Sequence, residues 1–474
     1  MIKHNSFSFI HAADLHLDSP FKGITTDSKS VGNALRSATF DAFNALIDLC
    51  IQKQVQFLLV AGDIYDGADR SLRAQLKFRD GLARLAKHNI HTFVVHGNHD
   101  PINSQSSAIE WPETVHIFNG NKVESKTATG QDNVPLALIS GISHGKSNET
   151  QNLTKKFSKE DPGVFHIGLL HCNVGSNTGH DPYAPCELSD LMHPGMDYWA
   201  LGHVHERGIL HTDPYVLYAG NTQGRNIREQ GERGCWLVTV ENRSVADIRF
   251  CPLDAARWLH TNVNIDNMQT VDELERAIWN NIKEIMDSQR QTVAQDFISS
   301  QGEREGVAGA PTERVVAWPV EGAAPLRGQA RAPTIESQQQ AHGIILRVNI
   351  AGSGPLFNEL QKENAVLDLL DRARENFASE DPFVWVQEIE VNCRPEIDLE
   401  KIKQRGDFLG QVVKIAEEIN DPKIGRPELL KPVLSDLFEN RHIQKALPEL
   451  SQDEMSGIIE KAALLCVNML EGNE

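Results

Sequence analysis

The chain has 474 residues, 40% of them hydrophobic, which is enough for two to four domains and at least one large core. Its seven cysteines stand singly without a CxxC pair, which argues against a disulfide-stapled scaffold and suits a reducing compartment. The formal net charge is −19 at pH 7 and no long Lys/Arg run occurs, so any grip on DNA phosphates would come from separated basic residues or a partner.

No apolar stretch approaches the roughly 20 residues that a membrane-spanning helix needs, and the first residues of the chain are largely polar. These features predict neither a membrane anchor nor a secretion signal. We therefore expect a cytoplasmic protein, and a nucleoid-associated one if it acts on DNA.

Short apolar runs alternate with helical patterns through the first half of the chain. Strands are predicted at residues 7–10, 57–62, 92–97, 136–142, 165–171 and 198–203. Between them, residues 31–54 and 69–88 carry apolar residues at helical spacing and predict helices that cover a sheet. Further β structure is predicted over residues 214–253. This order favours an α/β domain over residues 1–254.

Residues 255–397 predict a smaller α+β domain. Strands are expected at 260–265, 344–350 and 383–393, and helices at 270–288 and 356–377. The interval 290–342 is rich in Gln, Gly, Ala, Pro and Arg and has little periodicity, so we expect a disordered insert there. From 398 to 474 the pattern is almost entirely helical, with breaks near residues 420–422 and 448.

Five strand-like runs end in residue types that bind divalent cations. These residues are Asp14, His16, Asp63, Asn98, His171, His203 and His205. A single DxH or GNH occurs by chance in many proteins, but polar strand caps and core histidines do not explain five such ends in this order. In DLH the two ligand types are two residues apart, so both can reach one ion from an extended segment.

The types of ligand atom narrow the choice of metal. Carboxylate, amide and imidazole donors without thiolate favour Mn, Mg or Fe over a cysteine-based structural zinc site. We therefore predict two divalent ions, with Mn preferred and Mg or Fe as alternatives. A pair of ions about 3.5–4 Å apart can activate a water and absorb the charge of a phosphoester in hydrolysis.

The motifs DLH, GDIYD, GNHD and GHVH, together with the isolated His171, resemble the metallophosphoesterase superfamily over about residues 7–254. Within it, FIHAADLHLDSPF and YAGNTQGRNIREQGERG resemble the SbcD and YhaO branch of DNA repair exonucleases. The resemblance implies a four-layer α/β/β/α sandwich, in which two sheets pack face to face with helices outside. The smaller α+β domain and the helical C-terminal region would be additions to this sandwich.

The resemblance also implies how the ligands divide between two ions. The first ion would take Asp14, His16, Asp63 and His205, and the second would take Asp63, Asn98, His171 and His203. Asp63 would bridge both ions.

His99, between Asn98 and Asp100, is assigned to catalysis rather than to metal binding. In the superfamily that it resembles, this position protonates the leaving oxygen or stabilises the phosphorane. Asp66 could accept the other ring N–H of His99 and fix its tautomer, with a turn or helix N-cap as the alternative role.

Three arginines follow the GHVH motif closely enough to contact a substrate. Arg225, Arg228 and Arg233 are candidates for DNA backbone phosphate contacts, and a solvated loop is the alternative.

These features predict a two-metal phosphodiesterase that acts on DNA ends in repair. A small-nucleotide phosphodiesterase or a phosphatase remains an alternative, although GDIYDG and GNHD differ from the protein-phosphatase pattern. A scaffold that binds DNA ends without cutting them is a third possibility, against which the intact ligand set and His99 argue.

The C-terminal region suggests a protein partner. Its apolar residues recur at helical spacing in two helices, Ile402, Phe408, Val412, Val413, Ile415 and Ile419 in the first, and Met455, Ile458, Ile459, Ala462, Leu465, Cys466 and Met469 in the second. Either the helices only pack on each other, or they dock on an SMC-like ATPase of the SbcC or YhaN type, as the resemblance implies. A homodimer is also open.

Overall fold

The computed structural model of the protein describes residues 6–24, 26, 28–67, 70–104, 108–130, 134–158, 163–175, 181–299, 334–335, 343–420 and 452–471. One compact unit comprises Met1–Leu259, Lys283–Leu346 and Arg374–Gln387, and a second comprises His260–Ile282, Arg347–Ala373 and Glu388–Glu474. The domain boundaries expected from the sequence, 1–254, 255–397 and 398–474, stay predictions. Among the described residues, no helix is long and apolar enough to span a membrane.

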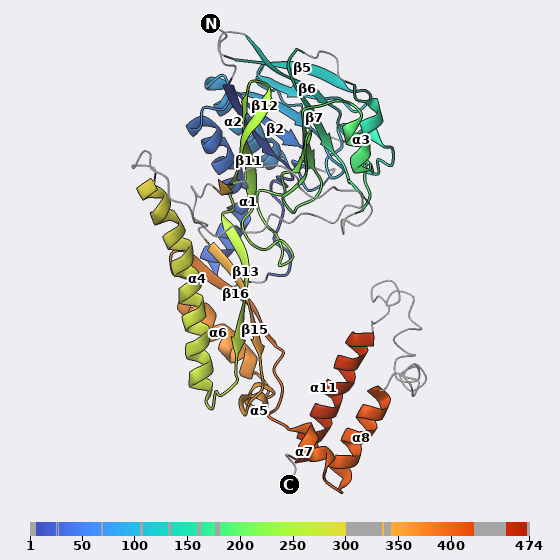
Figure 1. Ribbon diagram of the computed structural model, residues 1–474. Helices are drawn as coiled ribbons and strands as arrows, with labels where there is room; N and C mark the ends of the chain where they lie inside the picture. Colours follow the sequence, from blue (N-terminus) through green and yellow to red (C-terminus); the bar gives the residue numbers. More distant parts are fainter. Residues whose placement is uncertain are drawn as a thin grey trace. The chain divides into compact units, whose positions relative to one another are not determined.

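A seven-stranded sheet runs through the first unit in the order β14–β12–β11–β1–β2–β3–β4 (Figure 1). Its strands are β1 (Ser6–Ala12), β2 (Phe57–Ala61), β3 (His91–Val95), β4 (Val115–Ile117), β11 (Gly234–Glu241), β12 (Ser244–Pro252) and β14 (Thr334–Ile335). Strands β1 to β4 are parallel, whereas β11 pairs antiparallel with β1. Parallel pairing brings the carboxyl ends of β1, β2 and β3 to one edge of the sheet.

The second sheet of this unit has six strands in the order β5–β6–β7–β8–β10–β9. They are β5 (Glu124–Thr129), β6 (Pro135–Gly141), β7 (Phe165–His171), β8 (Tyr198–Gly202), β9 (Gly208–Thr212) and β10 (Tyr215–Tyr218). Strands β6, β7, β8 and β10 are parallel. The carboxyl ends of β7 and β8 therefore also share an edge.

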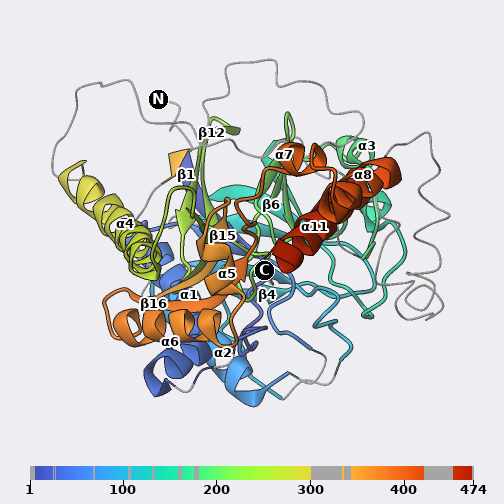
Figure 2. The same cartoon turned by 90° about the horizontal axis from the view of Figure 1, so that it is seen from below.

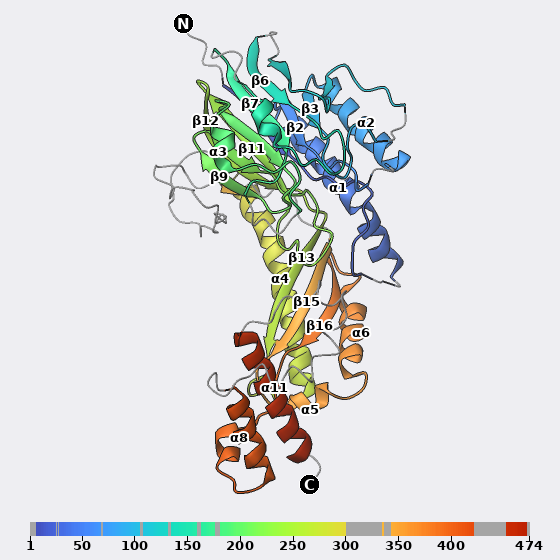
Figure 3. The same cartoon turned by 90° about the vertical axis from the view of Figure 1, so that its right-hand side faces the viewer.

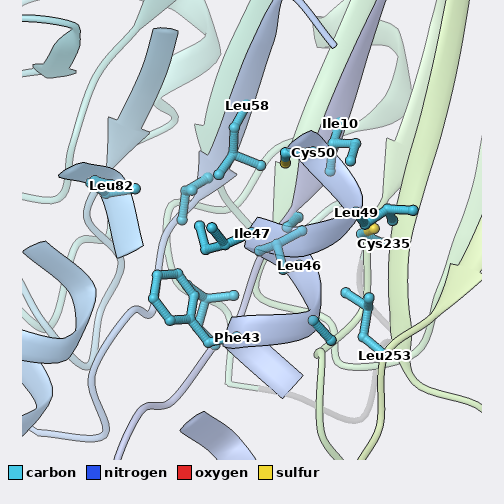
Figure 4. Packing of buried hydrophobic residues seen from close by; sticks show 14 of the residues in the cluster. Ile10, Phe43, Leu46, Ile47, Leu49, Cys50, Leu58, Leu82, Cys235 and Leu253 are labelled. Atoms are coloured by element: carbon cyan, nitrogen blue, oxygen red, sulfur yellow. The ribbon is translucent and has the colours of Figure 1, made fainter. Parts of the chain in front are cut away.

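Three apolar cores separate four layers of secondary structure. The first lies between the helices α1 (Lys29–Gln52) and α2 (Leu72–Lys87) and the seven-stranded sheet, where Phe43 and Leu46 contact the side chains of the strands (Figure 4). The second core lies between the two sheets and includes Phe57 and Ile167. The third covers the outer face of the six-stranded sheet.

The outermost layer on that side is thin. It consists of the short helix α3 (Leu188–Met192), the 3-10 turn η1 (Leu153–Lys156) and loops around Trp199. With this detail, the predicted α/β class and four-layer sandwich are confirmed. The six predicted strands all occur, because each buries its apolar residues on at least one sheet face.

A smaller sheet has the order β13–β15–β16, formed by β13 (Ala256–Asn264), β15 (Gly343–Ala351) and β16 (Phe383–Val391). Figure 3 shows these strands side by side with the helices α4 (Val271–Ser299) and α6 (Ala365–Phe377) along them. The helix predicted over 356–377 is divided, because Asn364 has a positive φ of 68° between α5 (Leu356–Leu360) and α6. A residue in that conformation cannot continue a right-handed helix.

The predicted insert 290–342 contains two segments of regular structure. Helix α4 continues through Ser299, since no Gly or Pro interrupts the sequence before Gly302, and β14 pairs with β12. The insert therefore does not begin at 290. Residues 300–333 and 336–342 lie outside the described residues.

The C-terminal region contains α7 (Leu399–Lys403), α8 (Phe408–Asn420) and α11 (Gln452–Glu471), and α8 and α11 lie side by side (Figure 2). The single helix predicted from Ile402 to Ile419 is wrong. The helix is interrupted around Gly406, and the side chain of Asp407 accepts a hydrogen bond from the Gly410 N–H at the start of α8. The breaks expected near 420–422 and 448 fall on 421–451, outside the described residues.

Gly168 in β7 lies at a closely packed position of the six-stranded sheet. A Cβ at Gly168 would lie 2.3 Å from Cε3 of Trp199, whose buried indole donates a hydrogen bond to the Leu191 carbonyl and cannot move freely. We expect Gly168→Ala to lower the free energy of unfolding by about 1–3 kcal/mol, measured by urea denaturation. Gly130→Ala is the control, because its nearest atom would be at 3.4 Å. Equal stability of both variants would contradict this description of the packing.

Candidate metal centre

The residues predicted to bind metal follow the carboxyl ends of strands from both sheets. Asp14 and His16 follow β1, Asp63 follows β2, Asn98 follows β3, His171 ends β7, and His203 and His205 follow β8. The structure brings all of these residues together. Ligand atoms of Asp14, His16 and His205 lie within 4.8 Å of one another, and so do those of Asp14, Asp63 and His171.

The backbone around the centre adopts conformations that L-residues rarely take. The φ angles are 51° at Asp14, 42° at His16, 48° at Asp63 and 103° at His203. Such conformations cost of the order of 1–3 kcal/mol each and concentrate at functional sites. They turn the chain sharply at the strand ends, so that residues close in sequence direct their side chains to the same place.

Two glycines of the motifs GDIYD and GNHD are required by close packing. A Cβ at Gly97 would lie 2.2 Å from the Asp63 carboxylate, and one at Gly62 would lie 2.4 Å from Nδ1 of His171. Gly62 also has a φ of 94°. Only glycine lets the chain approach these side chains so closely.

One ring nitrogen of each metal-site histidine faces an oxygen that can only accept a hydrogen bond. Nδ1 of His171 lies 2.9 Å from the Ala61 carbonyl, and Nε2 of His203 lies 2.9 Å from the Asp181 carbonyl. Nδ1 of His205 lies 2.8 Å from Glu229, and Nδ1 of His16 lies 3.1 Å from Asp66. His171, His203 and His205 form hydrogen bonds there, so the nitrogen that faces the oxygen carries the proton and the other ring nitrogen can act as a metal ligand. Nδ1 of His16 is close to Asp66, but the geometry is not that of a hydrogen bond.

The remaining ring nitrogens converge. Nε2 of His16 lies 3.1 Å from Nε2 of His205, whose Nδ1 faces Glu229. Nε2 of His171 lies 3.0 Å from Oδ1 of Asn98 in the same way. A cation near these nitrogen and oxygen atoms could be bound by several of them at once. The donor set therefore fits a divalent metal ion.

Burial disfavours the ionised form of the carboxylates at the centre unless a positive charge lies nearby. Asp14 and Asp63 are almost fully buried, and desolvation by burial raises the pKa of both carboxyls well above the ordinary value. The buried carboxylate of Asp100 nearby raises both pKa values further. A bound cation would favour the ionised carboxylates, which are the forms that can act as ligands.

His99 and Asp66 lie together, as the sequence suggested. Nδ1 of His99 is 3.4 Å from Oδ1 of Asp66, and the side chain of His99 is 43% exposed, so its other face is open to a substrate. Asp66 also contacts His16, a partner that the sequence did not suggest. Burial acts to raise the pKa of Asp66. The contacts of the Asp66 carboxylate with His16, Arg225 and Ser19 have the larger effect, so the pKa of Asp66 is lowered.

The three arginines differ in their surroundings. Arg225 is buried, and its guanidinium donates to Asp66 and Ser19. Arg233 is also buried, and it donates to the carbonyl of His205. Only Arg228 of the three has an exposed side chain. Arg225 and Arg233 therefore contact residues of the candidate metal centre, and of the three only Arg228 is open to solvent.

Two carboxylates of the centre were missed by the sequence analysis. Asp100 accepts hydrogen bonds from the Gly97 and Ile64 N–H groups and contacts His96, so it fixes the loop that carries His99. Its position in GNHD was a signal that could have revealed it. Glu229 contacts His205 from 24 residues away, and only its place in the NIREQGERG segment pointed to it.

A family comparison agrees with this geometry. Residues 7–207 match the family described as calcineurin-like phosphoesterase. The chain carries a calcineurin-like phosphoesterase domain. Proteins with this domain hydrolyse phosphoester bonds with divalent metals, and the grouped ligand atoms of the phosphoesterase domain are suited to such ions.

Individual relatives each match about half of the chain. An uncharacterized metallophosphoesterase, YhaO of Bacillus subtilis, is 41% identical over 50% of this chain and 59% of its own length. A DNA double-strand break repair protein, Mre11 of Thermoplasma acidophilum, is 25% identical over 52% of this chain and 64% of its own length. The chain thus spans about three fifths of these curated relatives. A crystal structure of a dimetal phosphatase from Danio rerio is 13% identical, with a TM-score of 0.30 over 50% of this chain and 93% of that one.

Asp63 lies near ligands expected for both ions, His16 at 3.9 Å and His171 at 3.5 Å, so its removal is the sharpest test of the ligand set. We expect Asp63→Ala to abolish cooperative binding of two Mn²⁺ ions, measured by calorimetric titration and metal analysis, because one carboxylate is assigned to both ions. Asp48→Ala, which removes an exposed carboxylate, is the control. Two ions bound to Asp63→Ala at wild-type affinity would show that the ligands are assigned wrongly.

Proposed function

We propose that this protein is a two-metal phosphodiesterase that cuts DNA at its ends during repair. The observation that carries the proposal is the convergence of four histidines on buried carboxylates, three of them with one ring nitrogen bonded to an oxygen, beside the accessible His99. The similarity to archaeal proteins named for DNA double-strand break repair supports DNA as the substrate. A cytoplasmic, nucleoid-associated location would accompany that substrate.

The proposed ligands are those expected from the sequence. Asp14, His16, Asp63 and His205 would hold one ion, and Asp63, Asn98, His171 and His203 would hold the other. When bound, the two ions would lower the pKa of a water molecule and withdraw charge from the phosphate. Mn²⁺ is the proposed ion, with Mg²⁺ or Fe²⁺ as alternatives, because the donors are oxygen and imidazole nitrogen.

The protein's own residues then have distinct tasks. His99 would donate a proton to the leaving oxygen from Nε2, because its Nδ1 faces Asp66. The same oxygen of Asp66 also pairs with the buried guanidinium of Arg225. Arg228 is the proposed contact to the DNA backbone.

The alternative substrates use the same chemistry. A small phosphodiester or a phosphate monoester would need the ions and His99 but no extended basic surface, and the net charge of −19 is compatible with that. A scaffold that does not cut would have no need of the accessible His99. Assays on DNA ends, DNA hairpins and bis-p-nitrophenyl phosphate separate these possibilities.

For catalysis, we expect His99→Ala to keep its Mn²⁺ affinity while turnover of DNA ends falls about 10²–10⁴-fold. Asp66→Ala should lower turnover less, and it should also weaken Mn²⁺ binding because His16 loses its partner. At saturating Mn²⁺, the double variant should be no slower than His99→Ala.

Steady-state rates for the four proteins complete this cycle. Fully multiplicative losses would show that Asp66 does not act through His99. Hydrolysis of bis-p-nitrophenyl phosphate without any cleavage of DNA would instead identify a small phosphodiester as the substrate class.

We also propose that residues 398–474 bind an SMC-like ATPase of the SbcC or YhaN type. Helix α11 buries Ile459, Ala463 and Val467, whereas other apolar residues of the expected helical pattern are exposed, namely Ile458, Ala462, Leu465, Cys466 and Met469. Leu465 is 44% exposed and Met469 is 68% exposed. An exposed apolar stripe beside a packed one suits a helix that docks into a groove of a coiled coil.

The exposed stripe gives a direct test of this partner. We expect Leu465→Glu with Met469→Glu to abolish co-purification with the ATPase, because two charges would be buried in an apolar interface. Hydrolysis of the small phosphodiester should be unchanged. Lys461→Glu is the control, since it changes an exposed charge of the same helix without altering the stripe. Undiminished co-purification of the double variant would refute this docking surface.

A further inference from the structure

Glu229 is a buried carboxylate with no ligand role in the set described above, yet every contact of its side chain bears on the metal centre. Its Oε1 lies 2.8 Å from Nδ1 of His205. Its Oε2 accepts hydrogen bonds from Nδ2 of Asn221 at 3.1 Å and from the Arg225 N–H at 2.7 Å. Both oxygens are therefore acceptors, and three donors surround them.

We propose that Glu229 is a positioning residue that holds His205 in the one tautomer able to bind metal. The inference deepens the proposed function and rests on it only in taking His205 as a ligand. A neutral imidazole can carry its proton on either nitrogen, and both tautomers are close in energy in water. Because a carboxylate can only accept, it keeps the proton on Nδ1 and leaves the Nε2 lone pair facing His16.

The contacts of Glu229 explain why an amide could not replace the carboxylate. Glutamine would offer one oxygen and one NH2 group to the same three donors. Its oxygen would face the two donors that cannot change their protons, Asn221 and the Arg225 N–H. Its NH2 group would then face Nδ1 of His205.

An NH2 group in that position would change the histidine. His205 can relieve the clash of two donors by moving its proton from Nδ1 to Nε2, because the ring has both tautomers available. The proton would then lie on the atom directed at His16, and no lone pair would remain there for a metal ion. Glu229→Gln should therefore act through the tautomer of His205, and not through lost packing.

Glu229 is also connected to Asp66 through Arg225. Glu229 accepts a hydrogen bond from the backbone N–H of Arg225, and the guanidinium of Arg225 donates to Asp66 and Ser19. Asp66 in turn contacts His16. Glu229 and Asp66 thus hold the two histidines that face each other, each through its Nδ1 atom.

The test compares wild type, Glu229→Gln and Glu232→Gln by two measurements that need no DNA. Glu232 is the matched control, because it lies in the same loop and forms ion pairs with Arg207 and Arg257. Long-range proton–nitrogen correlation spectra of the metal-free full chain show which ring nitrogen of His205 is protonated. The His205 signal is assigned from its absence in His205→Asn.

We expect a proton on Nδ1 in wild type and in Glu232→Gln, and a proton on Nε2 in Glu229→Gln. Calorimetric titration with Mn²⁺ should show about a 10- to 100-fold loss of affinity in Glu229→Gln alone. A His205 that keeps its proton on Nδ1 in Glu229→Gln, or an unchanged Mn²⁺ affinity, would overturn the proposal. So would a wild-type His205 protonated on Nε2.

If Glu229→Gln does not fold, as judged by thermal unfolding, Glu229→Ala replaces it because alanine introduces no new donor. Both tautomers of His205 should then be populated, and His205 protonated only on Nδ1 would overturn the proposal. A wild-type protein that binds Mn²⁺ but leaves DNA intact would contradict the proposed substrate and not the role of Glu229. Wild-type protein that binds no Mn²⁺ would contradict both.

Discussion

The metal centre depends on one constraint, namely that His171, His203 and His205 each have one ring nitrogen bonded to an oxygen that cannot donate. These oxygens are two backbone carbonyls and the Glu229 carboxylate, and they come from different parts of the fold. The constraint removes the choice of tautomer before any ion arrives. Nε2 of His205 then lies 3.1 Å from Nε2 of His16, and Nε2 of His171 lies 3.0 Å from Oδ1 of Asn98, an arrangement that fits a bound cation.

The two packed sheets meet this constraint by bringing parallel strand ends to one place. β1, β2 and β3 of one sheet and β7 and β8 of the other all end there, so residues far apart in sequence share one small volume. The Ala61 carbonyl that holds His171 belongs to the sheet opposite its own. The apolar core between the sheets thus fixes not only stability but also the protonation pattern of the ligands.

The same geometry explains the unfavourable backbone conformations and buried charges around the centre. Positive φ angles at Asp14, His16 and Asp63, and a glycine at position 97, are unfavourable or restrictive features that the rest of the domain must stabilise. Buried like charges at Asp14, Asp63 and Asp100 add to them. A bound cation would offset the repulsion between the buried carboxylates, which links metal binding to the stability of the domain.

The sequence by itself determined the class of fold, the strand order along the chain and the residue types at each strand end, because these follow from local periodicity and short motifs. It also placed Asp66 near His99. Only the tertiary structure decided that Glu229 holds His205, that Arg225 and Arg233 are buried, and which face of α11 is covered. These outcomes depend on approaches between residues distant in sequence, and no local spacing encodes such approaches.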